Sequence, residues 1–254
     1  MRIAIFSDVH GNLTALDTVL ADIKKQAPDT VAFAGDLCFG GARPAGCIER
    51  IKPDVDLLVY GNTDEFLFNM QPLPAMLSEE RKAGLLKQIE WTKEKLTAEQ
   101  LGWLSRLPFA QRISPTTSPT DDLLIVHANP KDVNAVIAPP EELQNEKLGK
   151  VAIPKDEKAL QGLLENVTAG VIAYGHVHFP NIQQVGDITL ANISSASLPM
   201  TRDGIARYGL LTWDKGAGWQ IEQRQVHYNY GKEQELLSFL QPPGWEYAAK
   251  GLGA

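Results

Sequence analysis

The first sixty residues alternate short apolar runs with helical segments, and this alternation constrains the fold more than any other feature of the chain. Residues 2–7, 30–34 and 56–60 have the length and apolar character of buried strands. Asn12 is expected to cap a helix between the first two strands, and a short helix around 48–51 is expected before the third. This order implies parallel pairing through right-handed crossovers, so the sequence predicts an α/β protein.

The remainder of the chain has a helical stretch followed by a strand-rich half. Residues 64–107 carry apolar residues at helical spacing and are expected to form helices lying on the core, with Thr97 and Gln100 as a capping box. Another helix is expected at residues 156–166, whereas the apolar residues of 130–154 show no clear period. Further strands are expected at 109–113, 123–126, 171–174, 182–185, 188–192, 206–213 and 219–227.

The size and charge of the chain narrow its organisation and its partners. With 254 residues, 44% of them apolar, the chain can bury one substantial core. We expect a single domain over residues 1–240, with 64–107 packed on it, and a C-terminal tail over 241–254 that is loose or packs peripherally. The formal net charge of -7 disfavours a broad surface for nucleic acid or anionic lipid and favours cations as partners.

Two features bear on the cellular location. The apolar run at the N-terminus stops at Asp8, which is too early for a signal peptide or a membrane span. A cytoplasmic location without membrane association is therefore expected. Cys38 and Cys47 are expected to be reduced thiols, because cytosolic disulfides are rare.

Polar side chains with the chemistry of metal ligands follow the predicted strands at the points where those strands end. In an open α/β sheet, ligands are expected at this edge. Four of the five histidines take part, and only His227 is left over. The candidate ligands are Asp8, His10, Asp36, Asn62, His127, His176 and His178.

This mixture of side chains suits a pair of divalent ions. Neutral imidazole is a good ligand for Mn, Fe and Zn, while carboxylate and amide oxygens disfavour a purely tetrahedral zinc site. A shared carboxylate can hold two ions about 3.5 to 4 Å apart, as in two-metal hydrolytic sites. Asp36 is the candidate for that bridge.

Five short motifs, in order and with the right spacing, resemble those of the calcineurin-like metallophosphoesterase superfamily, and the chain is similar to its small bacterial and archaeal phosphodiesterase branch. The resemblance runs from Met1 to about Tyr230 and implies a four-layer αββα sandwich of two mixed sheets flanked by helices. The motifs are Asp8-Val9-His10, Gly35-Asp36, Gly61-Asn62-Thr63-Asp64-Glu65, His127 and Gly175-His176-Val177-His178.

The resemblance also implies how the ligands divide between two divalent ions, with Mn favoured and Fe, Zn or Ni as alternatives. Asp36 would serve both ions, and a hydroxide held between the ions would attack phosphorus. Asp36, Asn62, His127 and Asp64 form the expected catalytic set, although Asp64 is equally well explained as a partner orienting ligands or as an acidic residue favoured at a helix N-terminus. One ion would take Asp8, His10 and His178, and the other Asn62, His127 and His176.

Thr63 departs from the family pattern, because many members have histidine there as the acid that protonates the leaving group. A threonine hydroxyl is a poor acid at neutral pH, so esters with good leaving groups are expected to be the better substrates. Arg43 and Thr63 are candidates for substrate binding, and Arg43 is equally well explained as a solvated loop arginine. The Asn192-Ile193-Ser194-Ser195 turn also departs from the pattern.

The function predicted from these residues is a dinuclear metal-dependent phosphoesterase. Its expected substrate is a small phosphorylated molecule, either a phosphodiester or a nucleotide with a phosphoanhydride bond. A phosphomonoesterase or protein phosphatase remains an alternative that Thr63 disfavours. A non-catalytic scaffold on the same fold, as in the retromer subunit of the superfamily, remains a second alternative, because fold alone does not determine function.

Overall fold

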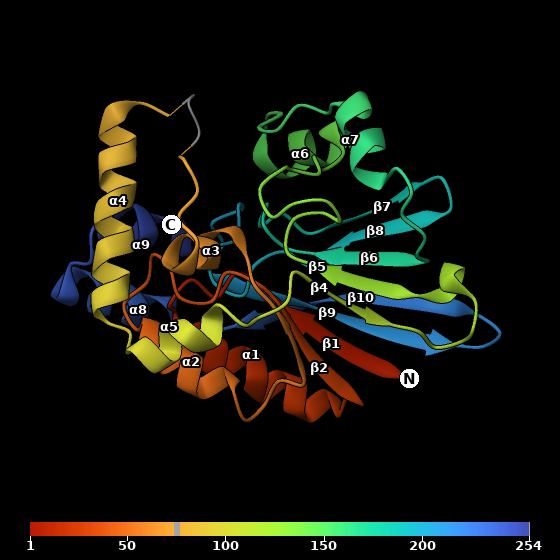
Figure 1. Cartoon of the computed structure of the whole chain (residues 1–254), viewed down its shortest axis with the longest axis horizontal. Coiled ribbons are helices and arrows are strands. Elements are labelled where there is room, and N and C mark those ends of the chain that lie inside the picture. The colour runs from red at the N-terminus through yellow and green to blue at the C-terminus, as the bar shows by residue number, and fades with distance from the viewer. Residues whose placement is uncertain (74–76, 254) are drawn as a thin grey trace.

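A computed structural model describes residues 1–73 and 77–253. The predicted helical segment 64–107 includes residues 74–76, and the predicted tail includes residue 254, so those four residues lie outside the described part. Two five-stranded mixed sheets stack between layers of helices (Figure 1). This arrangement confirms the predicted αββα sandwich.

The first sheet has the strand order β10-β9-β1-β2-β3. The three N-terminal strands pair in parallel, as the sequence predicts, while β9 lies antiparallel to both β1 and β10. The strand bounds are β1 (Arg2–Phe6), β2 (Thr30–Ala34), β3 (Leu57–Val59), β9 (Ile205–Asp214) and β10 (Gly218–His227).

The second sheet has the strand order β4-β5-β6-β8-β7. Its three central strands are parallel, and an antiparallel strand closes each edge. The bounds are β4 (Ala110–Ile113), β5 (Leu123–Val126), β6 (Val171–Tyr174), β7 (Asn181–Val185) and β8 (Ile188–Asn192).

Helices cover the outer faces of both sheets. Below the first sheet in Figure 1 lie α1 and α2, while α6 and α7 lie above the second, and α3 to α5 stand to one side with α8 and α9. The bounds are α1 (Leu13–Gln26), α2 (Pro44–Ile51), α3 (Asn62–Phe68), α4 (Glu79–Glu94), α5 (Ala98–Leu104), α6 (Glu141–Leu148), α7 (Glu157–Leu164), α8 (Tyr230–Leu240) and α9 (Trp245–Leu252).

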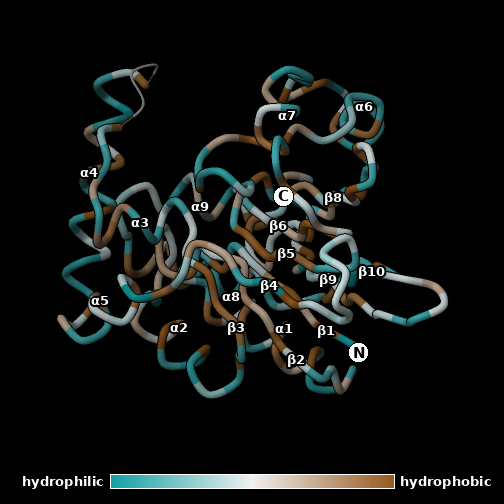
Figure 2. The backbone as a smooth tube through the Cα atoms, turned by 45° about the vertical axis from the view of Figure 1, so that its right-hand side comes forward, coloured by the Kyte–Doolittle hydropathy of each residue, from teal (hydrophilic) through white to brown (hydrophobic). Residues whose placement is uncertain are grey.

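Alternation of side chains along each strand builds three apolar layers. In β1, Ile3 and Ile5 point to the second sheet and pack on residues such as Ile125, while Ala4 and Phe6 point to the helices on the other face. The outer face of the second sheet packs in the same way against α7. Figure 2 shows apolar segments running through the central strands, with hydrophilic ones on the outer helices and loops.

The caps predicted from the sequence are present. The Asn12 side chain accepts the N–H of Ala15 at 2.9 Å, and Thr97 and Gln100 form a capping box. The C-terminal segment forms α9, which packs on α8 through the buried Leu252. Among the helices of the described residues, none combines the length and apolar character needed to cross a membrane.

Candidate metal centre

The carboxyl ends of five strands converge at one place, and each delivers candidate ligands. The strands that deliver them, β1, β2, β3, β5 and β6, come from both sheets. The residues delivered, in chain order, are Asp8 and His10, then Asp36, Asn62, His127, and finally His176 with His178. All seven candidate ligands therefore reach the same edge of the sandwich.

Five of these seven residues adopt a left-handed backbone conformation. A positive φ is uncommon outside glycine and costs free energy, so it persists only where the surroundings hold it, often at functional sites. Asp8, His10, Asp36, His176 and His178 have φ angles of 56°, 50°, 65°, 63° and 54°. Sharp turns directly after the strands thus aim these side chains at the common centre.

One group of side chains forms around Asp8. The Nε2 atom of His178 lies 3.0 Å from Oδ1 of Asp8, and the Nε2 atom of His10 lies 3.7 Å from the same oxygen. The two Nε2 atoms are 3.2 Å apart. One carboxylate oxygen and two imidazole nitrogens therefore face a shared point, close enough to coordinate one ion.

A second group forms around Asn62. Its Oδ1 atom lies 2.9 Å from Nε2 of His127 and 3.1 Å from Nδ1 of His176. His127 is fully buried, and the two rings meet edge to face with centroids 5.0 Å apart. An amide oxygen and two ring nitrogens thus converge on a second point.

Asp36 lies between the two groups. Its Oδ2 atom is 3.7 Å from Nε2 of His10 and 3.5 Å from Nε2 of His127. Its other oxygen accepts the backbone N–H of Thr63 at 2.9 Å, which fixes the orientation of the carboxylate. Asp36 is therefore placed to contact ions held by both groups.

Every histidine of the cluster has its remaining ring nitrogen against a backbone carbonyl oxygen. Such a partner fixes the tautomer and the ring orientation of a metal-binding histidine. The pairs are His10 Nδ1 with Phe39 at 3.0 Å, His127 Nδ1 with Ala34 at 2.9 Å, His178 Nδ1 with Leu198 at 2.7 Å and His176 Nε2 with Asn134 at 3.0 Å. The free nitrogens point inward as lone-pair donors, so the residues fit divalent metal ions.

Without metal, the buried charges shift each other's pKa values. Burial opposes ionisation of Asp8, yet His178 and His10 hold the pKa of that carboxyl well below its usual range. Burial also disfavours the charged form of His10, but Asp8 and Asp36 outweigh it and raise the pKa of His10 to about 9. Burial and the neighbouring His127 lower the pKa of His176 to about 4. The cluster thus concentrates negative charge that cations neutralise.

A family model agrees with this geometry. The model of the calcineurin-like phosphoesterase superfamily domain matches residues 1–216. The chain belongs to this superfamily. The superfamily is one of metal-dependent phosphoesterases, and the Asp and His groups described above could bind a metal ion.

Individual proteins are similar to this chain over nearly its whole length. An uncharacterized protein of Methanocaldococcus jannaschii is 27% identical over 262 residues, which cover 96% of this chain and 94% of that protein. A metallophosphoesterase from Sphaerobacter thermophilus is similar in structure, with a TM-score of 0.70, 21% identity and coverage of 99% and 98% of the two chains. A hypothetical protein from Pyrococcus horikoshii has a TM-score of 0.74 at 16% identity, with coverage of 99% and 97%.

Asp64, part of the catalytic set expected from the superfamily motif, lies behind the cluster. It is fully buried at the N-terminus of α3, and its Oδ2 atom accepts the backbone N–H groups of Asp36 at 2.8 Å and Gly61 at 3.1 Å. Its Oδ1 atom accepts the N–H of Leu37 at 2.9 Å. The carboxylate thus joins the two loops that carry Asp36 and Asn62.

The two candidate substrate-binding residues of the superfamily motifs have different surroundings. Arg43 pairs with the buried Glu233 of α8 and donates to the hydroxyl of Thr14 at 2.6 Å, so its guanidinium connects α2, α1 and α8. Thr63 adjoins the ligands through its backbone contact with Asp36, and its buried hydroxyl has no hydrogen-bond partner in the described part of the chain.

The turn in which this chain departs from the superfamily pattern supports the ligand loops. The Asn192 side chain donates to the carbonyl of Gly175 at 2.7 Å and accepts the N–H of Ser194 at 2.8 Å. Ser195 donates to the carbonyl of Asp8 at 2.8 Å. These supports, together with Ser7 at the Asp8 carboxylate, were not predicted. The one sequence signal for these residues is their position, either directly beside a ligand or at the end of a strand.

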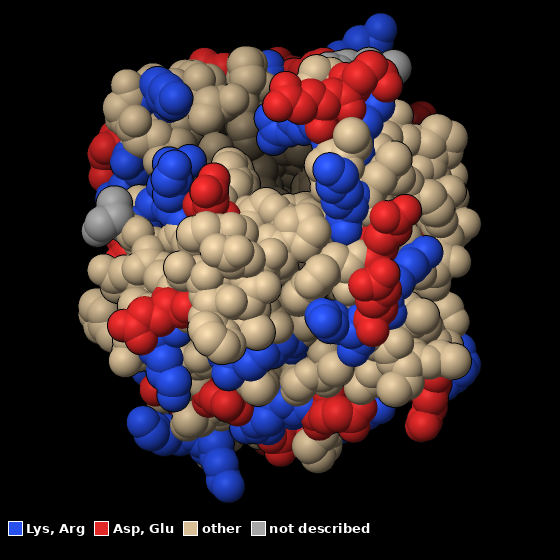
Figure 3. Space-filling model, turned by 90° about the vertical axis from the view of Figure 1, so that its left-hand side faces the viewer, with Lys and Arg blue, Asp and Glu red and all other residues tan. Residues whose placement is uncertain are grey.

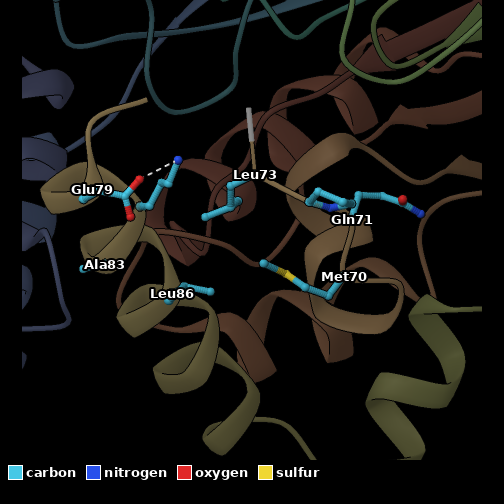
Figure 4. A pocket seen from close by; sticks show the side chains of 8 residues that line it. Met70, Gln71, Leu73, Glu79, Ala83 and Leu86 are labelled. Atoms are coloured by element: carbon cyan, nitrogen blue, oxygen red, sulfur yellow. Dashed lines mark hydrogen bonds and ion pairs between the residues drawn. The ribbon is translucent and has the colours of Figure 1, made fainter. Parts of the chain in front are cut away.

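Two cavities differ in their relation to the cluster. The larger, of about 610 Å³, lies between residues 70–73 and α4, where Met70 and Leu86 face the same gap (Figure 4). None of the candidate ligands is among the described residues that line it. The smaller, of about 260 Å³, directly adjoins His176 and His178. Viewed from the side of α4, the surface is hollowed, with basic and acidic side chains intermixed around the rim (Figure 3).

Proposed function

We propose that this chain is a dinuclear metal-dependent phosphoesterase that hydrolyses phosphodiesters or the phosphoanhydride bonds of nucleotides. The observation that carries the proposal is the position of Asp36, whose Oδ2 atom lies 3.7 Å from His10 and 3.5 Å from His127. One carboxylate between two separate ligand groups is the arrangement that two-metal hydrolysis requires.

In this proposal, one ion is held by Asp8, His10 and His178. The other would be held by Asn62, His127 and His176, and Asp36 would contact both. When bound, the ions supply Lewis acidity and lower the pKa of water toward ~7, which provides a nucleophile at neutral pH. Manganese is the favoured metal, because imidazole, amide and carboxylate ligands together suit it, with iron, zinc and nickel as alternatives.

The residues beside the proposed metal ions determine which leaving groups the enzyme can expel. The backbone N–H of Thr63 orients Asp36, but its hydroxyl is too weak an acid to protonate a departing alkoxide. Both carboxylate oxygens of Asp64 accept backbone N–H groups of the loop that carries Asp36, so Asp64 has a positioning role. Good leaving groups, such as nitrophenolate or a nucleotide phosphate, depart without an acid and are therefore favoured over alkyl monoesters or phosphoserine peptides.

A non-catalytic scaffold is the alternative from a different class. Buried carboxylates are costly unless they are paired or bind metal. Asp8 is fully buried and Asp36 is 2% exposed, and in the ion pairs of the described residues both have only histidine partners. A surface that serves only for docking has no physical need for this cluster, which favours the enzyme.

The test is hydrolysis of bis(4-nitrophenyl) phosphate by chelator-treated protein with and without added Mn²⁺. Wild type is expected to turn over only with metal, and Asp36→Asn is expected to lose at least about a hundredfold in rate, because the variant would hold less well the ions that stabilise developing charge. Wild-type protein that stays inactive with metal, or an Asp36→Asn variant as active as wild type, rejects the proposal.

A further inference from the structure

The cavity of about 260 Å³ beside the metal cluster has walls from three separate parts of the chain. His176 and His178 form one side. The loop 198–202 forms the second side, and Tyr247 with Gly251, from α9, forms the third. The C-terminal helix therefore contributes directly to a cavity that opens beside two candidate ligands.

Hydrogen bonds tie the loop 198–202 to the cluster. The carbonyl of Leu198 lies 2.7 Å from Nδ1 of His178, and the N–H of Met200 donates to the carbonyl of His178 at 3.0 Å. The N–H of Arg202 donates to the carbonyl of Pro199 at 2.9 Å and closes the turn. This wall of the cavity is therefore held at a fixed position relative to His178.

Tyr247 is presented to the cavity by a helix that is itself anchored. The side chain of Gln234, in α8, donates to the carbonyls of Ala249 at 2.9 Å and Gly253 at 3.1 Å. Leu252 is only 2% exposed, whereas Tyr247 is 72% exposed. An aromatic ring on a fixed helix, largely in solvent, offers a free face for stacking.

Arg202 supplies a cation to the same cavity. It is exposed and takes part in none of the ion pairs of the described residues. The neighbouring Asp203 does not neutralise it, because that carboxylate pairs with Arg207 at 2.5 Å and accepts the hydroxyl of Thr201 at 2.8 Å. A guanidinium without a carboxylate partner is suited to a phosphate oxygen.

We propose that this cavity binds the nucleoside part of a nucleotide substrate, with the base stacked on Tyr247 and an anionic phosphate oxygen paired with Arg202. The volume is just below the roughly 300 Å³ at which pockets for drug-sized molecules begin, which suits a small ligand such as one nucleoside. The apolar Leu198 and Pro199 suit a flat ring rather than a sugar alone. The proposal rests on the proposed function for the reaction and adds the class of substrate.

The test is calorimetric titration of the Mn²⁺-loaded protein with adenosine 5′-monophosphate and, separately, with methyl phosphate. The two probes share the phosphate group and differ in the nucleoside. Adenosine 5′-monophosphate is expected to bind about fivefold or more tightly, the lower end for one base stacked on an aromatic side chain. Tyr247→Ala is expected to bring this affinity ratio close to one, while Tyr247→Phe keeps it.

Arg202→Ala is expected to lower the affinity for adenosine 5′-monophosphate and to reduce its dependence on salt concentration. Phe239→Ala is the matched control, because Phe239 is 84% exposed on α8 and does not line the cavity. Its affinity ratio is expected to equal that of wild type. Equal affinity for the two probes in wild type, or an unchanged ratio in Tyr247→Ala, overturns the proposal.

The two proposals fail in distinguishable ways. Selective binding of adenosine 5′-monophosphate without hydrolysis of bis(4-nitrophenyl) phosphate supports the nucleoside cavity and rejects the proposed function. Metal-dependent hydrolysis without selective binding rejects the cavity and leaves the proposed function standing.

Discussion

The carboxylate of Asp64 accepts the backbone N–H of Asp36 at 2.8 Å, so one buried aspartate fixes the residue proposed to bridge two metal ions. Asp36 has a φ of 65°, and the contact from Asp64 is part of what holds that unusual conformation. Burial, and after it the charge of Asp36, raises the pKa of Asp64 to about 6.

Asp64→Asn is expected to weaken metal binding about 10- to 100-fold, the usual cost of losing a group that orients metal ligands. An amide replaces one acceptor oxygen by a donor, which then faces backbone N–H groups. Calorimetric titration with Mn²⁺ measures the effect, with Glu65→Gln as the control one residue later. Equal Mn²⁺ affinity in the two variants would contradict the positioning role of Asp64.

Gly175→Ala is expected to disturb the site from the opposite side. A Cβ atom at Gly175 would collide with the hydroxyl of Ser7 and with Oδ2 of Asp8. We expect a folded protein whose Mn²⁺ affinity falls at least about tenfold, since the Asp8 carboxylate must shift. Gly162→Ala is the control, because nothing lies within 4 Å of its Cβ and alanine suits the interior of α7. Unchanged Mn²⁺ affinity in Gly175→Ala would show that Asp8 does not need its present position.

Much of the fold and the candidate ligands could be predicted from the sequence, because both follow from strands with strong apolar signals. β1, β2 and β5 are short and apolar, and a candidate ligand follows each of them within two residues, namely Asp8, Asp36 and His127. The carboxyl ends of neighbouring parallel strands within one sheet lie together, so Asp8 and Asp36 were expected to meet. His127 joins them because the second sheet stacks on the first with the carboxyl ends of its parallel strands at the same edge.

What could not be predicted depends on contacts that leave no periodic pattern. Gln144 is the only buried residue of α6, and it holds the segment by hydrogen bonds to Pro139 and Ile153 at 2.8 Å rather than by apolar packing. The ion pair of Arg43 with Glu233 was not predicted either, because the two residues lie 190 positions apart in the sequence. The contact between the backbone carbonyl of Asn134 and the ring of His176 could not be predicted either, since every residue carries a backbone carbonyl.

Arg43→Ala is expected to lower the free energy of unfolding by about 3–5 kcal/mol, because it leaves the charge of Glu233 buried without its partner. Glu233 is 1% exposed, whereas Arg50 pairs with exposed Asp17 and Asp54. Arg50→Ala is therefore the control and is expected to cost about 1 kcal/mol or less. Urea unfolding of both variants provides the measurement, and comparable losses would contradict the structural role of Arg43.

His10 predicts a pH dependence for the metal-free protein. Its pKa is raised from 6.5 to about 9 in the fold, so its contribution to stability is fully present below pH 6.5 and is lost as the pH rises through 9. Metal binding removes that proton, so Mn²⁺ affinity rises over the same range.

Denaturant unfolding of chelator-treated wild type and His10→Gln at pH 6.5, 7.5 and 9 checks this expectation. The stability difference between the two proteins should shrink as the pH rises. A constant difference across the three pH values would contradict the assignment of this effect to His10.

The most direct test of the account is the anomalous difference map of a crystal grown with Mn²⁺. Two peaks are expected about 3.5 to 4 Å apart. One should lie among Asp8, His10 and His178, the other among Asn62, His127 and His176, and the Asp36 carboxylate should contact both. A single peak, peaks elsewhere, or a map without peaks would contradict the proposal that these seven side chains hold a pair of ions.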